Sequence, residues 1–132
     1  MITRVRTVTV YVRDQDRAVT FYTDMLGFEV RVDQPMGDGQ RWIELAPPGA
    51  DTVIVPFTPQ GTGSQGMEGR IGGFSGLVFA CTDIARTFRD LSGRGVKFTQ
   101  EPKQESWGAM AQFHDVDGNV FVLVEERKEG GA

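Results

Sequence analysis

The sequence contains one strand–helix–strand pattern twice, and this repetition constrains the fold more than any other feature. In the first copy, Val8, Val10 and Val12 alternate with threonine and tyrosine, which is typical of a half-buried strand. Asp14 follows as a candidate helix cap, because its carboxylate can accept hydrogen bonds from the first helical turn. In the second copy, Asp83 stands 69 positions after Asp14 and again follows an alternating run. We therefore expect a duplicated supersecondary unit.

Each copy continues with the same order of elements. The first predicted helix ends at Gly27, and its apolar positions are Ala18, Val19, Tyr22 and Leu26. Further strand patterns lie at 28–32, 40–45 and 52–57, and in the second copy near 93–98, at 109–115 and at 120–125.

These elements predict an α+β fold built from two tandem βαβββ modules. Their mixed sheets would form a curved, half-open cup with the helices on the outer face. We expect the modules at 1–58 and 74–132, joined by a glycine-rich linker at 59–73, and together forming a single domain.

Strand alternation also predicts which side chains face the inside of the cup. The apolar members of each alternation would meet the helices, and the residues between them would line the concave side. The inward-facing residues predicted in this way are Thr7, Thr9, Trp42, Glu44, Met110, Gln112 and His114.

Charge and hydropathy exclude several classes of protein. The formal net charge is −4 and no basic stripe is present, so we expect no nucleic-acid partner. The N-terminus runs directly into a strand pattern without an apolar signal region, and no apolar run approaches the roughly 20 residues that span a bilayer. We therefore expect a cytoplasmic protein without a membrane partner.

The single cysteine, Cys81, excludes an intrachain disulfide. It alternates with Leu77 and Phe79, so we interpret it as a core residue rather than as a nucleophile.

Two runs together resemble a known family: "VRDQDRAVTFYTDMLGFEV" at 12–30 and "FHDVDGNVFVLVE" at 113–125. They are similar to the vicinal oxygen chelate superfamily, which includes glyoxalase I, extradiol dioxygenases, fosfomycin-resistance transferases and bleomycin-resistance proteins. The resemblance spans nearly the whole chain. It implies paired βαβββ modules with a small-molecule site inside the cup, which is commonly completed in a homodimer.

The resemblance also implies where a metal would be held, on the first and fourth strands of each module. Carried over to this sequence, these positions fall on Thr7, Val55, Gly76 and Val122, none of which offers a carboxylate or an imidazole. The chain has one histidine, His114, so one chain cannot assemble the usual site of two histidines and one carboxylate. We therefore expect no metal and no other cofactor.

Without metal ligands, the cup is predicted to be a largely apolar cavity for a small organic ligand. Trp42 would stack on a planar or apolar ligand, Thr9 and Gln112 would donate hydrogen bonds, and Trp107 would act as a lid. In the fosfomycin-resistance members that the chain resembles, the positions matching Thr9, Trp42 and Gln112 lie near substrate. The predicted ligand-binding residues are Thr7, Thr9, Trp42, Val55, Gly76, Trp107, Met110, Gln112 and Val122.

Three functions remain open at this point. The first is a metal-free protein that sequesters or carries a small apolar or aromatic molecule, as the bleomycin-resistance group does. The second is a glyoxalase-like lyase or related enzyme, with Glu44 and His114 as acid and base or with a metal site of another kind. The third is a structural or regulatory dimer module. Each residue also has a structural alternative: Trp42 could fill the floor of the cup, Glu44 could be solvated at its edge, and His114 could precede a turn.

Overall fold

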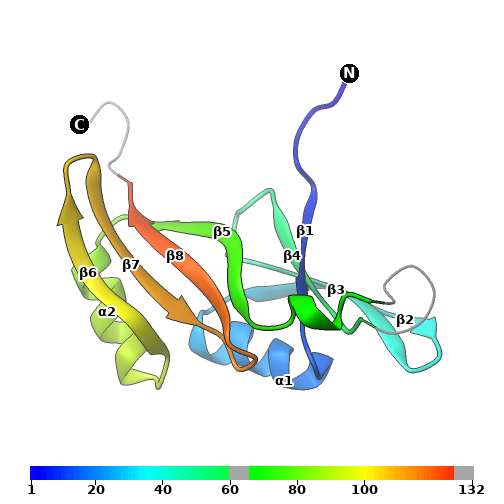
Figure 1. Ribbon diagram of the computed structural model, residues 1–132. Coiled ribbons are helices and arrows are strands. Elements are labelled where there is room, and N and C mark those ends of the chain that lie inside the picture. Colours follow the sequence, from blue (N-terminus) through cyan, green and yellow to red (C-terminus); the bar gives the residue numbers. More distant parts are fainter. Residues whose placement is uncertain (60–65, 127–132) are drawn as a thin grey trace. The chain divides into compact units, whose positions relative to one another are not determined.

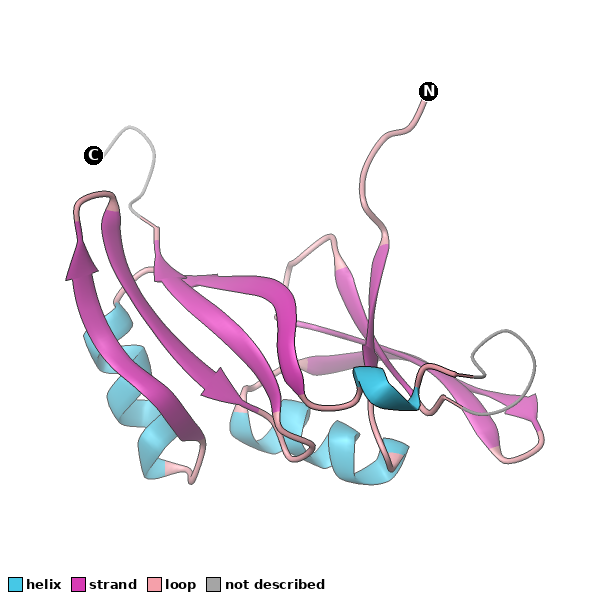
Figure 2. Ribbon diagram, in the orientation of Figure 1, coloured by secondary structure: helices cyan, strands magenta, loops and turns pink. Residues whose placement is uncertain are grey.

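The structure is a computed structural model, and it describes residues 1–59 and 66–126. The backbone contacts divide the chain into two units, Met1–Gly72 and Gly73–Ala132, and each unit is described by itself. Figures 1 and 2 show the helices and strands of both units.

The first unit contains a four-stranded mixed sheet with the strand order β1-β4-β3-β2 (Figure 1). β1 runs parallel to β4, and the other neighbours are antiparallel. A π-helical turn, η1, continues the first helix, and α1 contacts β4. The elements are β1 (Thr7–Tyr11), α1 (Gln15–Thr20), η1 (Phe21–Met25), β2 (Glu29–Gly37), β3 (Gln40–Ala46), β4 (Val53–Phe57) and the 3-10 helix η2 (Glu68–Arg70).

The second unit repeats this arrangement with the strand order β5-β8-β7-β6. β5 runs parallel to β8, and α2 packs along one side of the sheet, where it contacts β6, β7 and β8 (Figure 2). The elements are β5 (Gly73–Cys81), α2 (Ile84–Gly93), β6 (Lys97–Glu105), β7 (Gly108–His114) and β8 (Asn119–Glu125).

The repeated aspartates start both helices, as the sequence predicts. The side chain of Asp14 accepts a hydrogen bond from the backbone N–H of Arg17 at 3.0 Å, and Asp83 accepts one from Arg86 at 3.1 Å. The first helical run ends at Gly27, whose φ of +77° is a left-handed conformation that favours glycine. The duplicated βαβββ order and the α+β class are therefore confirmed, with one open mixed sheet in each unit.

Each unit has its own apolar core between its helix and one face of its sheet. Strand alternation predicts these core faces correctly, because the apolar residues on them are buried. The core of the first unit includes Val10, Val12, Ala18, Tyr22, Ile43, Leu45 and Ile54, and that of the second includes Ile84, Leu91, Ala111, Phe113, Phe121 and Leu123.

The structure leaves parts of the predicted organisation untested. The union of the two sheets in one cup stays a prediction, as do the module bounds 1–58 and 74–132. The predicted linker at 59–73 includes 60–65, which lie outside the described residues, and β5 already begins at Gly73. Within the described part of the chain, no helix is both long enough and apolar enough to cross a membrane.

Candidate functional site

The face of the first sheet that points away from α1 carries the predicted site residues of this unit. The β1–β4 register pairs Thr7 with Val53 and Thr9 with Val55, so all four side chains lie on the same face. On β3, Ile43 and Leu45 are fully buried in the core beneath α1, which places the alternate residues on the opposite face. We call this surface the distal face; its residues are Thr7, Thr9, Trp42, Glu44, Val53, Val55 and Phe57.

The polar centre of the distal face is a hydrogen-bonded chain from Trp42 through Glu44 to Arg6. The indole Nε1–H of Trp42 donates to Oε2 of Glu44 at 2.8 Å, and Nη1 of Arg6 donates to the same oxygen at 3.0 Å. The side chain of Glu44 is 7% exposed, whereas that of Arg6 is 60% exposed. Glu44 is therefore a buried acceptor with two donors and not a solvated residue at an edge. Its carboxylate fixes the orientation of the indole ring through this hydrogen bond.

Trp42 also contacts a second aromatic ring of the distal face. Its ring centroid lies 6.5 Å from that of Phe57, with an interplanar angle of 61°, an edge-to-face geometry. Trp42 is half-buried, so part of the indole remains open to solvent. A ring that is held by a hydrogen bond and an aromatic neighbour keeps its orientation, which reduces the entropy lost when a ligand binds against it.

A network at the other end of β3 fixes the strand that carries Trp42. The guanidinium of Arg41 forms ion pairs with Asp33 on β2 at 3.0 Å and with Asp16 on α1 at 2.6 Å, and these hydrogen bonds raise the pKa of Arg41. The buried side chain of Gln15 donates to the carbonyl oxygens of Arg41 at 2.7 Å and Pro56 at 3.0 Å. Gln15 thus links β3 and β4 through a carbonyl oxygen of each strand.

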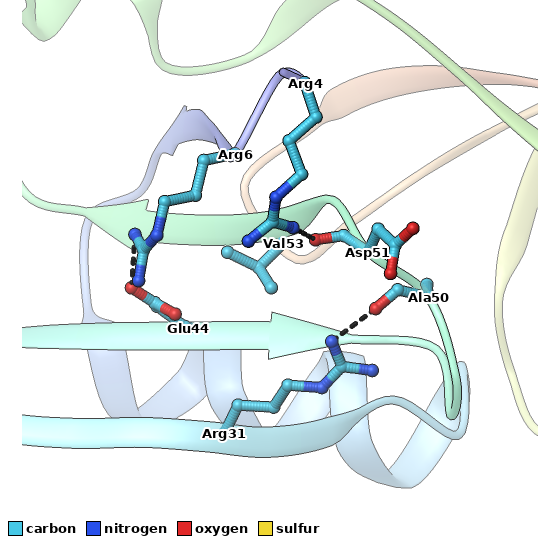
Figure 3. A pocket seen from close by; sticks show the side chains of 7 residues that line it. All are labelled: Arg4, Arg6, Arg31, Glu44, Ala50, Asp51 and Val53. Atoms are coloured by element: carbon cyan, nitrogen blue, oxygen red, sulfur yellow. Dashed lines mark hydrogen bonds and ion pairs between the residues drawn. The ribbon is translucent and has the colours of Figure 1, made fainter. Parts of the chain in front are cut away.

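A pocket of about 280 Å³ opens where β1 and β4 begin (Figure 3). Three arginines from two segments converge on it: Arg4 and Arg6 lie just before β1, and Arg31 lies on β2. The other lining side chains include Glu44, Asp51 and Val53, so the pocket adjoins the distal face. The sequence interpretation missed this pocket. Its only signal was the pair of arginines in "TRVRT" ahead of the first strand.

The second unit has a corresponding distal face, on the side of its sheet opposite α2. The β7–β8 register pairs Met110 with Val124, Gln112 with Val122 and His114 with Val120, and all of these residues are half-buried. This surface is more apolar than the first distal face, since Val78, 58% exposed, also lies on it opposite Val122. Its polar members are Gln112 and His114.

His114 makes a local contact in this unit. Its Nδ1 lies 2.9 Å from the carbonyl oxygen of Asp115, at the start of the turn into β8. This matches the structural alternative of a histidine that precedes a turn. Glu44 belongs to the first unit and His114 to the second, so their use as an acid–base pair stays a prediction.

Two further predicted ligand residues lie in irregular backbone. Gly76 sits where the β5–β8 register shifts between Phe74 and Val78, and its φ of +80° explains why glycine occupies the position. Trp107 lies in the turn between β6 and β7 and is 62% exposed. Its role as a lid stays a prediction.

The positions at which the resemblance places metal ligands do not fit a metal. Thr7 offers only a hydroxyl group, and Val55, Gly76 and Val122 have no donor atom in their side chains. Glu44, the carboxylate of the first distal face, already accepts hydrogen bonds from two residues. Across residues 1–59 and 66–126, no group of three or more histidine, cysteine, aspartate or glutamate side chains could hold an ion.

Cys81 is half-buried on β5, on the same side of the sheet as Phe79, which packs on Phe113 and Phe121. Burial raises the pKa of the Cys81 thiol, and this effect exceeds the opposing hydrogen bonds from Thr87 and Asp83. The thiol is therefore poorly suited to act as a nucleophile.

Comparison with protein families gives a match over most of the chain. Residues 4–123 match the model described as the Glyoxalase/Bleomycin resistance protein/Dioxygenase superfamily. The chain is also 43% identical over 127 residues to YetH, an uncharacterized protein of Bacillus subtilis, and the match covers 95% of this chain and all of YetH.

Two solved structures share both the fold and more than a third of the sequence. A superfamily member from Sphaerobacter thermophilus is 37% identical, with a TM-score of 0.85, covering 95% of this chain and 98% of that protein. TnmS3 from Streptomyces sp. CB03234, described as an antibiotic binding protein, is 36% identical, with a TM-score of 0.78, covering 94% of this chain and 96% of TnmS3.

Proposed function

Since the chain belongs to the glyoxalase/bleomycin resistance protein/dioxygenase superfamily, we propose that it binds a small planar or apolar organic molecule and sequesters or carries it without a metal. The binding surface is the distal face of the first unit. Its half-buried indole, Trp42, stacks on the ligand, while Thr9 fixes the ligand's orientation by hydrogen bonding.

The observation that carries this proposal is the fixed orientation of Trp42. The 2.8 Å bond from its Nε1 to Glu44 uses the only polar atom of the indole and leaves the apolar ring to meet a ligand. Burying one face of such a ring removes apolar area from water, which contributes about 25 cal/mol of binding free energy per Å². A tryptophan that merely filled a core would be fully buried, whereas Trp42 is not.

The comparisons support this reading of the site. TnmS3, which matches this chain over nearly its full length, is described as an antibiotic binding protein. The donor set at Thr7, Val55, Gly76 and Val122 does not suit a metal-dependent reaction of the kind that chelating members of the superfamily carry out. Binding without chemistry needs apolar area and a few hydrogen bonds, which Trp42, Phe57 and Thr9 of the distal face can supply.

A thermal-shift screen with planar aromatic molecules tests the proposal. A ligand of this class should stabilise the folded protein by about 2.7 kcal/mol at one hundred times its Kd. Trp42→Ala should abolish the shift, and Trp42→Phe should retain part of it, because a ring remains but the bond to Glu44 that fixes it is lost. Val116→Ala is the matched control, since it also shortens an exposed apolar side chain, in a turn of the second unit.

Two results would overturn the proposal: no planar molecule stabilises the protein, or the shift in Trp42→Ala equals that of the parent chain. Any ligand that is found should also be recovered unchanged after incubation. If a product appears instead and Glu44→Gln prevents it, the protein is an enzyme that uses Glu44. The expected homodimer is tested separately, by sedimentation of the protein with and without ligand.

A further inference from the structure

The pocket beside the distal face has the opposite charge character to the chain as a whole. The chain carries a formal net charge of −4, yet this pocket brings together the guanidinium groups of Arg4, Arg6 and Arg31. From this we infer that the pocket binds an anionic group, a carboxylate above all, on the ligand that the distal face holds. The inference rests on the proposed function and adds the chemical class of the ligand.

Arg4 and Arg6 have hydrogen-bond donors that the described part of the chain does not use. A guanidinium has five N–H groups in a planar fork that matches the two oxygens of a carboxylate. Within the described residues, Arg4 commits one N–H, to the carbonyl oxygen of Asp51 at 2.5 Å, and Arg6 commits one, to Glu44 at 3.0 Å. Most of the donors of these two side chains therefore remain for a ligand.

The three arginines of the pocket differ in whether a carboxylate pairs with them. The charge of Arg6 is matched by Glu44, and that of Arg31 by Glu29, whose carboxylate lies 3.1 Å from Nε of Arg31. Arg4 is different: it contacts a neutral carbonyl, and no carboxylate in the described part of the chain forms an ion pair with it. Figure 3 shows the Asp51 carboxylate pointing away from the Arg4 guanidinium. Arg4 is thus the one of the three guanidinium groups without an ion pair among the described residues, and the lining, with three arginines against Glu44 and Asp51, is positive on balance, so an anion would be attracted.

The guanidinium groups are held in position before a ligand arrives. Arg31 donates to the carbonyl oxygens of Ala50 and Pro47, and Arg4 to that of Asp51, so the loop between β3 and β4 holds both side chains (Figure 3). The N-terminal segment is fixed as well, because the N–H of Val53 donates to the carbonyl oxygen of Arg6 at 3.0 Å. Donors held in place lose little entropy on binding.

The volume of the pocket and its place beside the distal face suit an anionic substituent of the ligand. A volume of about 280 Å³ is close to the lower end of the roughly 300–1,000 Å³ that is usual for ligand pockets, so the pocket has room for a carboxylate. Glu44 and Val53 line the pocket and also belong to the distal face. A ligand with its ring on Trp42 can therefore place a charged substituent near Arg4.

Three probes separate the anion site from the aromatic site. 2-Naphthoate carries both a planar ring and a carboxylate, 2-naphthamide carries the ring with a neutral group of the same shape, and inorganic phosphate carries charge alone. Calorimetric titration gives the Kd of the two aromatic probes. The ¹H–¹⁵N spectrum follows the indole N–H of Trp42, assigned with Trp107→Phe, since the chain has two tryptophans.

Two substitutions test whether Arg4 is responsible for anion binding. Arg4→Gln removes the charge that has no ion pair among the residues described, and Arg4→Lys keeps the charge but removes the planar fork. Arg89→Gln is the matched control, because Arg89 is an exposed arginine on α2 in the second unit. All three variants change exposed side chains, so the fold should be retained.

We expect 2-naphthoate to bind about tenfold more tightly than 2-naphthamide, the difference expected for one charge-assisted hydrogen bond. Arg4→Gln should bring this ratio close to one, Arg4→Lys should leave an intermediate ratio, and Arg89→Gln should not change it. A ratio near one in the parent chain, or a ratio unchanged by Arg4→Gln, overturns the anion site while leaving the proposed function intact. If neither aromatic probe binds but phosphate causes a spectral change that depends on Arg4, the anion site stands and the proposed function fails. If phosphate also has no such effect, the anion site fails too.

Discussion

The bond between Trp42 and Glu44 can be measured with a double-mutant cycle, because Trp42→Phe removes the donor and Glu44→Gln removes the charge of the acceptor. Trp42→Phe deletes the indole N–H, and Glu44→Gln replaces the buried carboxylate with a neutral amide. The cycle compares the free energy of unfolding of the parent, the two single variants and the double variant. The coupling that results is the difference between the bond to the charged carboxylate and the bond to the neutral amide.

The magnitude follows from the geometry. A hydrogen bond to a charged group contributes about 1.5–3 kcal/mol, and a bond between neutral groups about 0.5–1.5 kcal/mol. At 2.8 Å, with Glu44 only 7% exposed, the bond belongs to the first class, whereas glutamine restores a bond of the second class. We therefore expect a coupling of about 1 kcal/mol. The ion pair with Arg6 adds little to the single Glu44→Gln variant, at most about 1 kcal/mol, because the arginine is largely in solvent.

Urea denaturation followed by circular dichroism measures the four free energies. Glu101→Gln is the control for the loss of one negative charge, since Glu101 is exposed on β6 and should change stability by less than about 0.5 kcal/mol. The indole N–H resonance of Trp42 should also move in Glu44→Gln. A coupling below about 0.3 kcal/mol with an unmoved resonance would show that Glu44 does not hold the ring, and the argument for a fixed binding surface would fail.

Three more predictions concern the scaffold. Gln15→Met should destabilise the protein by about 2–4 kcal/mol in urea, because it removes three bonds to backbone groups of β3 and β4. Asp115→Ala should cost a similar amount, about 2–4 kcal/mol, since its buried carboxylate accepts three hydrogen bonds in the turn before β8. Cys81 should react with iodoacetamide more slowly at neutral pH than a free cysteine, and its rate should rise only at higher pH, because burial raises its pKa.

Each of these predictions has a result that contradicts it. A loss below about 1 kcal/mol in Gln15→Met would mean that water replaces the side-chain bonds at the end of β3. Asp115→Asn should be milder than Asp115→Ala, since the amide keeps one acceptor oxygen, and equal losses would count against the hydrogen-bond account. Alkylation of Cys81 as fast as that of free cysteine at pH 7 would show that the thiol is not protected.

The fold was predictable because its signals are local. Strand alternation in Val8–Val12 and a capping aspartate each depend on a few neighbouring residues, and the structure places both as expected. The duplication then fixed the order of the remaining elements. The shift in register around Gly76 was not predictable, because strand periodicity assumes regular pairing and one isolated glycine does not reveal a bulge.

The candidate site was predictable only in part. Parity placed Trp42 and Glu44 on one face, but it could not show that Glu44 would be buried and bonded to Arg6, 38 positions away in the sequence. The arginine pocket was missed for the same reason. Arg4 and Arg31 are distant in sequence, and they meet only because the loop between β3 and β4 offers carbonyl oxygens to both.

The residues that reveal the family are different from those that would select a ligand. Asp14 caps a helix, and Asp115 holds the turn before β8 through three hydrogen bonds, so the two most recognisable motifs serve backbone geometry. Neither aspartate lies on a distal face. Ligand selection would depend instead on side chains such as Trp42 and Arg4, which can change without disturbing a cap or a turn. The scaffold of the superfamily can therefore be kept while its binding surface changes.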